Sequence, residues 1–283
     1  MSTLQNFTGH KPTWCPGCGN WGIGMALKMA FVELGYSPSS VFLSFGIGCS
    51  GNMNDFINGY AMHGLHGRAV ATAIGMKLAN HKVPVCAIVG DGDCYGEGGN
   101  HFLHACRGNH DIKVIIHDNR VYGLTTGQVA PTAQKGQKSK STPSGIIEIP
   151  VDPLALAITQ GATFVAQTFA GDTKHMVEII KKAFQHEGFA VVNVLQPCVT
   201  FEKLSSYQYY MQHIYKLDSH YNPANKMTAL ATAFEVEQEK YPLGVLYQVQ
   251  RKAYHQEAII NNAVSLINQS RFQDFDKLVE EFI

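Results

Sequence analysis

The stretch VPVCAIVGDGDCYGEGGN, residues 83–100, decides how this chain is expected to fold. It begins with an apolar run that is rich in valine, which favours a strand buried on both faces of a sheet. The run ends on two aspartates a residue apart, Asp91 and Asp93. In an open parallel sheet, ligands bind beyond the carboxyl ends of the strands. The two carboxylates therefore stand where a binding site is expected.

Similar apolar runs recur along the chain and alternate with segments of helical spacing. The other strand-length runs lie at 41–45, 112–116 and 189–195. The segments with helical spacing lie at 20–34, 68–80, 98–108 and 172–187. This alternation predicts an α/β fold, with a parallel sheet covered by helices on both faces.

The remainder of the chain is less regular. Residues 127–150 show almost no periodicity, and loops of that length are usually lids or partner-contacting segments. Beyond Cys198 the composition turns to Tyr, Gln, His and Lys, with one plausible helix at 223–240. We expect residues 1–200 to form the main domain and residues 201–283 to form an extension packed on the core or on a partner.

Composition limits the partners and the compartment. The 22 basic and 22 acidic residues leave no net charge, so neither nucleic acid nor an anionic membrane has an electrostatic reason to bind. No apolar run reaches the length of a membrane span, and the first ten residues contain no apolar signal region. These features predict a cytoplasmic protein. Seven cysteines in a reducing compartment favour metal or redox chemistry over disulfides.

The glycines and the carboxylate of GDG predict a metal-bridged phosphate. Glycine lets a backbone approach a phosphate closely, whereas a carboxylate repels it unless a divalent cation lies between them. Asp91 therefore predicts Mg²⁺, which needs further oxygen ligands. The next strand ends at Asn119, whose side-chain oxygen can supply one, and the Val121 carbonyl can supply another. Taken alone, GDGD is also compatible with a plain polar turn.

Four cysteines follow a second pattern. Cys15 and Cys18 form a CxxC in WCPGCGN, while Cys49 and Cys198 each follow a predicted strand. Four thiolates at one edge of a sheet suit a [4Fe-4S] cluster or a closed zinc site, and spacing alone does not separate the two. A thioredoxin-like CxxC would directly follow a strand, and no strand is predicted before Cys15.

The other three cysteines have simpler interpretations. Cys86 lies inside an apolar run and is expected to be a small core residue, and Cys106 lies on a predicted helix. Cys94 follows GDGD directly. It is therefore the rival for the fourth cluster ligand, and it is more strongly expected to line the cofactor cavity.

The glycines of GIGCSG, Gly46, Gly48 and Gly51, also fit the GxGxxG pattern of nicotinamide-binding proteins. That fold needs a helix at this point and an acidic residue about 20 positions further on for the ribose. The sequence has no acidic residue between Asp55 and Asp91. A dinucleotide site is therefore disfavoured.

Together these motifs identify a family resemblance. WCPGCG, GIGCSG, HGRA, GDG and YGLTTGQ occur in an order similar to that of the thiamine diphosphate-binding beta subunits of 2-oxoacid:ferredoxin oxidoreductases of the short two-subunit type. The resemblance implies the thiamine diphosphate-binding fold, with Mg²⁺ held by Asp91, Asn119 and the Val121 carbonyl. It implies a [4Fe-4S] cluster on Cys15, Cys18, Cys49 and Cys198. It also implies a cofactor contact from His66, the catalytic candidate, and a cofactor-binding set of Ile47, Gly48, Cys49, Ser50, Gly92, Asp93, Gly123 and Leu124.

The resemblance further implies an activity and partners. The beta subunit would act with an alpha subunit in oxidative decarboxylation of a 2-oxoacid to an acyl-coenzyme A, with electrons leaving through the cluster to ferredoxin. The chain has strands for one sheet only, so the carboxylate that activates the aminopyrimidine ring would come from the alpha subunit, and the chain alone would be inactive.

The substrate is less defined. Asn52 stands where some members carry a lysine that could pair with a second carboxylate, so 2-oxoglutarate, pyruvate and branched-chain 2-oxoacids all stay open. The C-terminal segment is more similar to members that act on 2-oxoglutarate. Two alternatives to the main hypothesis are a zinc-stapled non-catalytic partner subunit and a non-redox thiamine-dependent decarboxylase subunit.

Overall fold

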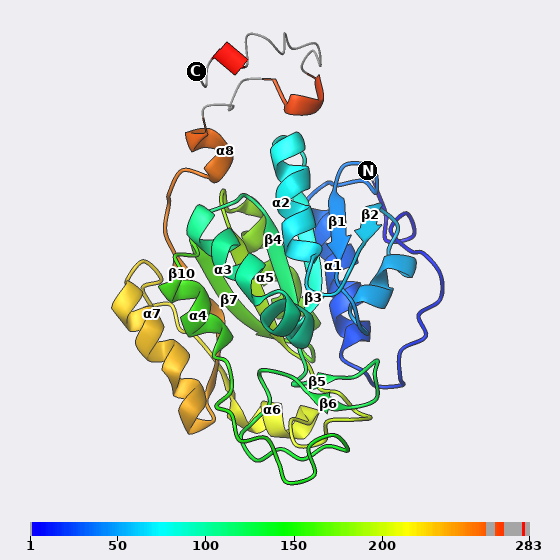
Figure 1. Ribbon diagram of the computed structural model, residues 1–283, viewed down its shortest axis with the longest axis vertical. Coiled ribbons are helices and arrows are strands. Elements are labelled where there is room, and N and C mark those ends of the chain that lie inside the picture. Colours follow the sequence, from blue (N-terminus) through cyan, green and yellow to red (C-terminus); the bar gives the residue numbers. More distant parts are fainter. Residues whose placement is uncertain (1, 259–263, 269–278, 281–283) are drawn as a thin grey trace.

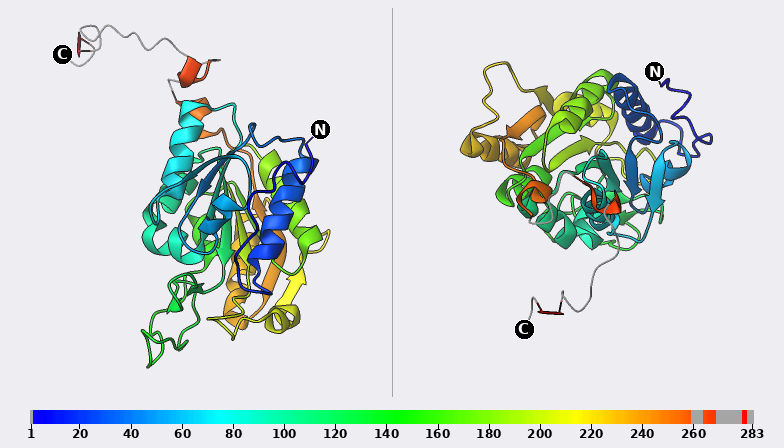
Figure 2. Two further views of the ribbon diagram at one scale, coloured as in Figure 1. Left: turned by 90° about the vertical axis from the view of Figure 1, so that its right-hand side faces the viewer. Right: turned by 90° about the horizontal axis from the view of Figure 1, so that it is seen from above.

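A single mixed sheet of eight strands organises the molecule. The computed structural model describes residues 2–258, 264–268 and 279–280. The strand order is β2-β1-β3-β4-β8-β7-β10-β9, and the strands from β2 to β7 in this order are mutually parallel. Figure 1 and Figure 2 show this sheet between two layers of helices. The predicted parallel α/β architecture is therefore confirmed.

The elements follow the expected alternation closely. The strands of the main sheet are β1 (Phe42–Phe45), β2 (Tyr60–His63), β3 (Val85–Gly90), β4 (Lys113–Asp118), β7 (Phe164–Phe169), β8 (Ala190–Leu195), β9 (Ile214–Lys216) and β10 (Tyr241–Gln248). A small hairpin is formed by β5 (Val121–Tyr122) and β6 (Gln128–Val129). The helices are α1 (Asn20–Glu33), α2 (Ala69–Ala79), α3 (Gly99–Gly108), α4 (Pro153–Thr159), α5 (Thr173–Gln185), α6 (Tyr207–His213), α7 (Lys226–Ala233) and α8 (Tyr254–Glu257). Shorter helical turns are η1 (Gly51–Asp55), η2 (Gly92–Glu97), η3 (Phe234–Gln238) and η4 (Leu266–Asn268).

Two hydrophobic cores hold the layers to the sheet. Apolar side chains of α1 and α5 pack on one face, around Leu27 and Ile180. On the other face, side chains of α2, α3, α4 and α7 pack around Phe102 and Val114. The four strands predicted from continuous apolar runs all lie at the centre of this sandwich, which explains why they lack an alternating pattern.

The sequence prediction missed four strands of the sheet. β2, β7, β9 and β10 were not recognised, and the expected helix at 223–240 is divided into α7 and η3. The segment after residue 200 supplies β10, which pairs antiparallel with β7. Its last part, residues 259–263, 269–278 and 281–283, lies outside the described residues. Within 127–150 the structure has β6 and otherwise only turns and irregular backbone, as expected.

A buried ion cluster stabilises the edge of the sheet opposite the predicted site. Lys77 and Lys113 pair with Asp111 at N–O distances of 2.6 and 2.7 Å. Burial opposes ionisation of Asp111, but the two ammonium groups overcome it and hold the pKa of Asp111 well below its usual range. The group therefore contributes stability above about pH 4, and this contribution is lost only in stronger acid.

Substituting Asp111→Asn should lower the free energy of unfolding by about 3–5 kcal/mol, because two buried ammonium groups then lack their counter-ion. The matched control is Glu33→Gln. Glu33 pairs with Lys181 at the surface, where such a pair contributes about 1 kcal/mol or less. Urea unfolding followed by circular dichroism measures both. Equal losses in the two variants would contradict the assignment.

None of the helices within the described ranges is both long and apolar enough to cross a lipid bilayer.

Candidate functional site

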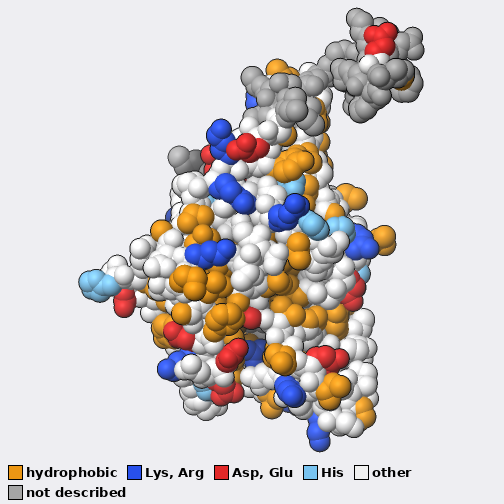
Figure 3. Space-filling view, turned by 60° about the vertical axis from the view of Figure 1, so that its left-hand side comes forward, with side chains coloured by type: hydrophobic (Ala, Val, Ile, Leu, Met, Phe, Trp, Pro, Cys, Tyr) orange, Lys and Arg blue, Asp and Glu red, His pale blue; other side chains and the backbone are white. Residues whose placement is uncertain are grey.

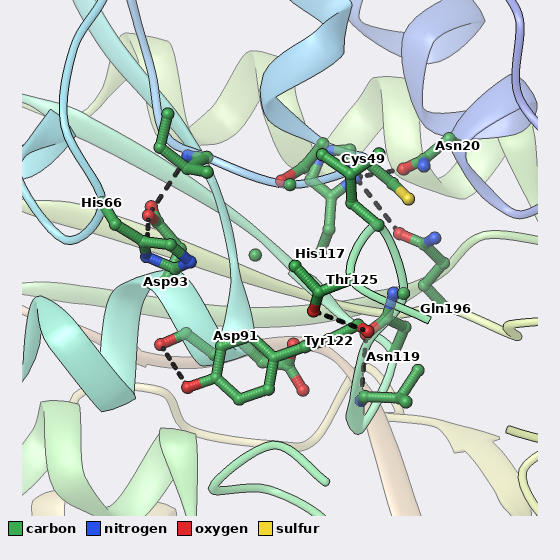
Figure 4. A pocket seen from close by; sticks show the side chains of 18 residues that line it. Asn20, Cys49, His66, Asp91, Asp93, His117, Asn119, Tyr122, Thr125 and Gln196 are labelled. Carbon is green, nitrogen blue, oxygen red and sulfur yellow. Dashed lines mark hydrogen bonds and ion pairs between the residues drawn. The ribbon is translucent and has the colours of Figure 1, made fainter. Parts of the chain in front are cut away.

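The predicted cofactor residues meet at one edge of the sheet, in a pocket beyond the carboxyl ends of β1, β3 and β4. The parallel register brings Gly90 of β3 beside His117 of β4, so the residues that follow these strands lie side by side. Figure 4 shows the side chains that converge there. The pocket is lined by Asn20, Ile47, Gly48, Cys49, Ser50, His66, Gly90, Asp91, Gly92, Asp93, His117, Asn119, Val121, Tyr122, Gly123, Leu124, Thr125 and Gln196. Every residue expected to bind thiamine diphosphate or Mg²⁺ is among them.

The GDG turn is shaped for close approach. Asp91 occupies the position just before η2, a π-helical turn of the kind often found at functional sites. A Cβ atom on Gly92 would lie 2.4 Å from the ring of Tyr122, so only glycine fits there. The backbone at Gly92 therefore lies directly against the Tyr122 ring.

Asp91 is a buried carboxylate without a cationic partner in the described part of the chain. Its Oδ2 accepts hydrogen bonds from the Arg120 backbone N–H at 2.7 Å and from the Thr132 hydroxyl at 2.5 Å. Burial, followed by the nearby charge of Asp118, raises the pKa of Asp91 to about 8. A buried carboxylate in this state is stabilised by a cation, so the site fits a divalent ion.

Asn119 supplies the neighbouring oxygen. Its side-chain Oδ1 accepts a hydrogen bond from the Val121 backbone N–H at 3.2 Å, which fixes the amide just after β4. Amide and carboxylate oxygens are ligands that Mg²⁺ accepts. Asp91 and Asn119, which follow the adjacent strands β3 and β4, therefore offer two oxygen ligands for Mg²⁺.

His66 lies close to two carboxylates on one side of the pocket. Its Nδ1 lies 2.8 Å from Asp93 Oδ1 and 3.2 Å from Glu97 Oε2. The same Asp93 oxygen accepts hydrogen bonds from the backbone N–H groups of Ile47 and Gly67. Asp93 therefore joins two loops beside the imidazole, and burial raises the pKa of the Asp93 carboxyl.

A polar cluster that sequence reasoning missed forms the opposite side of the pocket. His117 Nδ1 lies 2.7 Å from Asn20 Oδ1 and 3.1 Å from Gln196 Oε1. Figure 4 shows Gln196 and Asn20 across the pocket from Asp93 and His66. Burial lowers the pKa of His117 to about 3, so the ring is neutral. The available signal was the alternation along β4, which places His117 on the same side as Asn119.

The four predicted cysteine ligands line a second cavity of about 250 Å³, next to the first. Cys49, Asn119, Gly123, Leu124 and Gln196 line both cavities. A Cβ atom on Gly123 would lie 3.5 Å from the Cys49 sulfur and 3.9 Å from the Cys198 sulfur, which places both thiols beside the loop at Gly123.

The thiols influence one another's ionisation. Burial, the charge of Cys198 and that of Cys15 raise the pKa of the Cys18 thiol to about 11. Burial and the charges of the other three thiols likewise raise the pKa of Cys49 to about 11. Such thiols need a strongly positive centre to bind as thiolates. In the described ranges, no three His, Cys, Asp or Glu side chains gather around a single ion position.

The remaining cysteines lie elsewhere. Cys86 is fully buried in the core beneath α1 and α5, as expected. Cys94 packs in the opposite core with Cys106 and lines neither cavity, so the expectation that it lines the cofactor cavity is wrong. Cys94 lies within the π-helical turn η2, and its side chain is buried in this core. Downstream of GIGCSG the chain forms η1 and β2, which is not the helix that a dinucleotide site needs.

A third cavity of about 420 Å³ lies between α4, β10 and the irregular segment before α4. Figure 3 looks onto this face and shows a hollow bordered by charged side chains, with apolar side chains around it. Asp118, Arg120 and Asp152 line this cavity. It is distinct from the two cavities at the motif residues.

Comparison with known proteins agrees with this geometry. Residues 46–194 match the family model of the thiamine pyrophosphate enzyme, C-terminal TPP binding domain. Residues 198–260 match the family model for the C-terminal part of the beta subunit of pyruvate ferredoxin oxidoreductase. The fold and the site therefore define a thiamine diphosphate-binding domain of an oxidoreductase.

Individual relatives narrow the class. The chain is 42% identical to the 2-oxoacid:ferredoxin oxidoreductase subunit beta of Saccharolobus solfataricus, over 92% of this chain and 90% of that protein. It is 41% identical to a 2-oxoglutarate synthase subunit of Archaeoglobus fulgidus, over 68% of this chain and 71% of that protein. A solved structure, 2-oxoglutarate:ferredoxin oxidoreductase from Magnetococcus marinus with 2-oxoglutarate, coenzyme A and succinyl-CoA bound, shares 34% identity, covers 99% of this chain and 96% of that chain, and gives a TM-score of 0.91. The chain belongs to the beta-subunit family of the 2-oxoacid:ferredoxin oxidoreductases.

Proposed function

We propose that this chain binds thiamine diphosphate and Mg²⁺ in the pocket at the ends of β1, β3 and β4, and that it oxidatively decarboxylates a 2-oxoacid together with an alpha subunit. The observation that carries the proposal is the buried Asp91 carboxylate near Asn119, at a glycine turn that lines the same pocket. The family match supports the same cofactor.

The chain's own groups would hold and orient the cofactor. Asp91, Asn119 and the Val121 carbonyl would bind Mg²⁺, and the backbone at Gly92, Gly123 and Leu124 would contact the diphosphate. The loop at 47–50 would lie along the cofactor, supported by the bond from Ile47 N–H to Asp93. When bound, thiamine diphosphate supplies the chemistry that releases carbon dioxide from a 2-oxoacid.

His66 is the proposed catalytic residue. Its Nδ1 lies 2.8 Å from Asp93 Oδ1 and 3.2 Å from Glu97 Oε2, so we assign Nε2 as the ring nitrogen that makes a polar contact with substrate or cofactor.

The cysteine cavity is proposed to hold a [4Fe-4S] cluster on Cys15, Cys18, Cys49 and Cys198. Its place beside the first pocket supports this, because electrons from the 2-oxoacid must leave one at a time to reach ferredoxin. A zinc ion in the same place would be structural, since zinc carries no redox chemistry.

An alpha subunit is the proposed partner. Tyr60, Met62 and Leu65 are strongly exposed apolar side chains on and just after the edge strand β2, close in sequence to His66. Exposed apolar patches of this kind often mark protein interfaces. We propose that this surface faces the alpha subunit, which would supply the carboxylate for the aminopyrimidine ring.

We propose that the chain divides into two parts that correspond to the two family matches. Residues 1–200 would form the cofactor-binding domain, and residues 201–283 would form an extension that packs on the core or the partner. Pairing of β10 with β7 and the boundary between the matches at 194–198 support this.

The chain purified alone should show no turnover of any 2-oxoacid, because the ring carboxylate is proposed to come from the alpha subunit. Adding the alpha subunit should restore coenzyme A-dependent release of carbon dioxide. The measurement is reduction of ferredoxin under anaerobic conditions. Turnover by the chain alone would contradict the shared active site.

The function itself is tested on the copurified complex. Pyruvate, 2-oxoglutarate and branched-chain 2-oxoacids should be assayed with coenzyme A and ferredoxin, with 2-oxoglutarate the first candidate. A brown complex with about four irons per beta chain supports the proposal. A colourless zinc protein would support the non-catalytic alternative, and carbon dioxide release without a cluster would support a non-redox decarboxylase.

A further inference from the structure

A chain of hydrogen bonds connects the two cavities. Gln196 lies just beyond the end of β8, is only 1% exposed and lines both cavities. Its Nε2 donates to the sulfur of Cys18 at 3.7 Å, while its Oε1 lies 3.1 Å from His117 Nδ1. The side chain therefore touches a proposed cluster ligand at one end and the wall of the cofactor pocket at the other.

The Gln196 amide has its oxygen toward His117 and its NH₂ group toward Cys18. In this arrangement Asn20 Oδ1 and Gln196 Oε1 both face His117 Nδ1, so this nitrogen carries the proton. The imidazole N–H is shared between the two oxygens, and the Gln196 NH₂ group donates to the Cys18 sulfur.

His117 Nε2 forms the other end of this chain of hydrogen bonds. A neutral imidazole with its proton on Nδ1 presents a lone pair at Nε2, and His117 Nε2 is buried without a protein partner in the described residues. This nitrogen belongs to a residue that lines the cofactor pocket. The hydrogen-bond chain thus runs from the cofactor pocket through His117 and Gln196 to Cys18.

We propose that Gln196 is a positioning residue for electron transfer, and that its N–H···S bond to Cys18 raises the reduction potential of the cluster. The inference rests on the proposed function, because it assumes a cluster on Cys18. Reduction adds one electron to the cluster and places more negative charge on its sulfur ligands. A donor aimed at a sulfur stabilises that reduced form more than the oxidised form.

Replacing Gln196→Leu should therefore make the cluster harder to reduce. We expect a shift of roughly tenfold in the equilibrium for the one-electron couple, which corresponds to a midpoint potential about 59 mV more negative. Gln196→Glu keeps the size of the side chain and replaces the NH₂ group with a carboxyl group. Titrated at a pH above the pKa of this buried carboxyl, its negative oxygen should shift the potential further in the same direction.

The experiment is a redox titration of the anaerobically purified complex, followed by the electron paramagnetic resonance signal of the reduced cluster. The matched control is Gln167→Leu, because Gln167 is a similarly buried amide that bonds to Asn193 and to the Pro242 carbonyl and lines neither of these cavities. It should leave the midpoint potential unchanged.

The outcomes separate the inference from the proposed function. A cluster whose potential is the same in the wild type and both Gln196 variants would overturn the role of Gln196 and leave the proposed function standing. Loss of iron from both Gln196 variants would also overturn it, because a tuning bond is not needed for assembly. A wild-type complex without iron would refute the proposed function itself.

Discussion

Substituting Asp91→Asn should weaken Mg²⁺-dependent binding of thiamine diphosphate by roughly 100-fold or more, and it should leave the iron content unchanged. Even residues that only support a metal ligand contribute about 10–100-fold to affinity, so loss of a direct ligand should exceed that range. Asparagine is nearly isosteric and keeps an oxygen toward Thr132. The expected loss therefore comes from the missing charge and not from a cavity.

In the cofactor-free protein, the Asp91→Asn variant should be at least as stable as the wild type. The pKa of Asp91 is raised to about 8 in the folded chain, so folding disfavours the ionised form at any pH above the ordinary range of a carboxyl group. Without Mg²⁺ this cost grows as the pH rises toward 8. A neutral amide removes it, and the free energy of unfolding should stay unchanged or increase.

Isothermal titration calorimetry with thiamine diphosphate and Mg²⁺ measures the affinity, and urea unfolding measures the stability. Asp152→Asn is the matched control, because Asp152 caps α4 and lines the third cavity, and asparagine caps helices equally well. Unchanged cofactor affinity in the Asp91→Asn variant would show that the metal binds elsewhere.

The sequence predicts the four central strands β1, β3, β4 and β8, but not β7 or the outer strands β2, β9 and β10. The predicted strands at 83–89 and 112–116 are continuous apolar runs, and burial on both faces produces such runs. β7 carries polar residues such as Gln167 that are buried and paired with neighbouring amides, so its pattern resembles a half-exposed segment. β2 is only four residues long and exposed throughout, so it lacks the continuous apolar run of a buried strand.

The site shows the same limit. Asp91, Asn119 and the cysteines were predictable because their chemistry depends on residue type and on position after a strand. Thr132 and Gln196 were not, because each acts through one contact made across the fold. Thr132 bonds to a carboxylate 41 positions away, and Gln196 bonds to a thiol 178 positions away. Pairings of that range follow from the register of the sheet, which local pattern does not specify.

Cys198 carries the second large expected effect. It lies just after β8, is 8% exposed and is the proposed fourth ligand of the cluster. Substituting Cys198→Ser should lower the iron content and reduce electron transfer to ferredoxin by at least roughly tenfold, because a serine oxygen is a poor substitute for a thiolate on iron.

Cofactor binding separates this effect from general damage. The Cys198→Ser variant should still bind thiamine diphosphate, because Asp91 and Asn119 follow β3 and β4, which the substitution does not touch. Cys106→Ala is the matched control, since this buried thiol on α3 lies in the core formed with α2, α4 and α7 and lines neither cavity. Iron analysis and stopped-flow reduction of ferredoxin measure the two variants. Full retention of iron in Cys198→Ser would remove Cys198 from the ligand set. Because Cys94 is buried in the core, the fourth ligand would then have to be a residue other than cysteine or come from the partner.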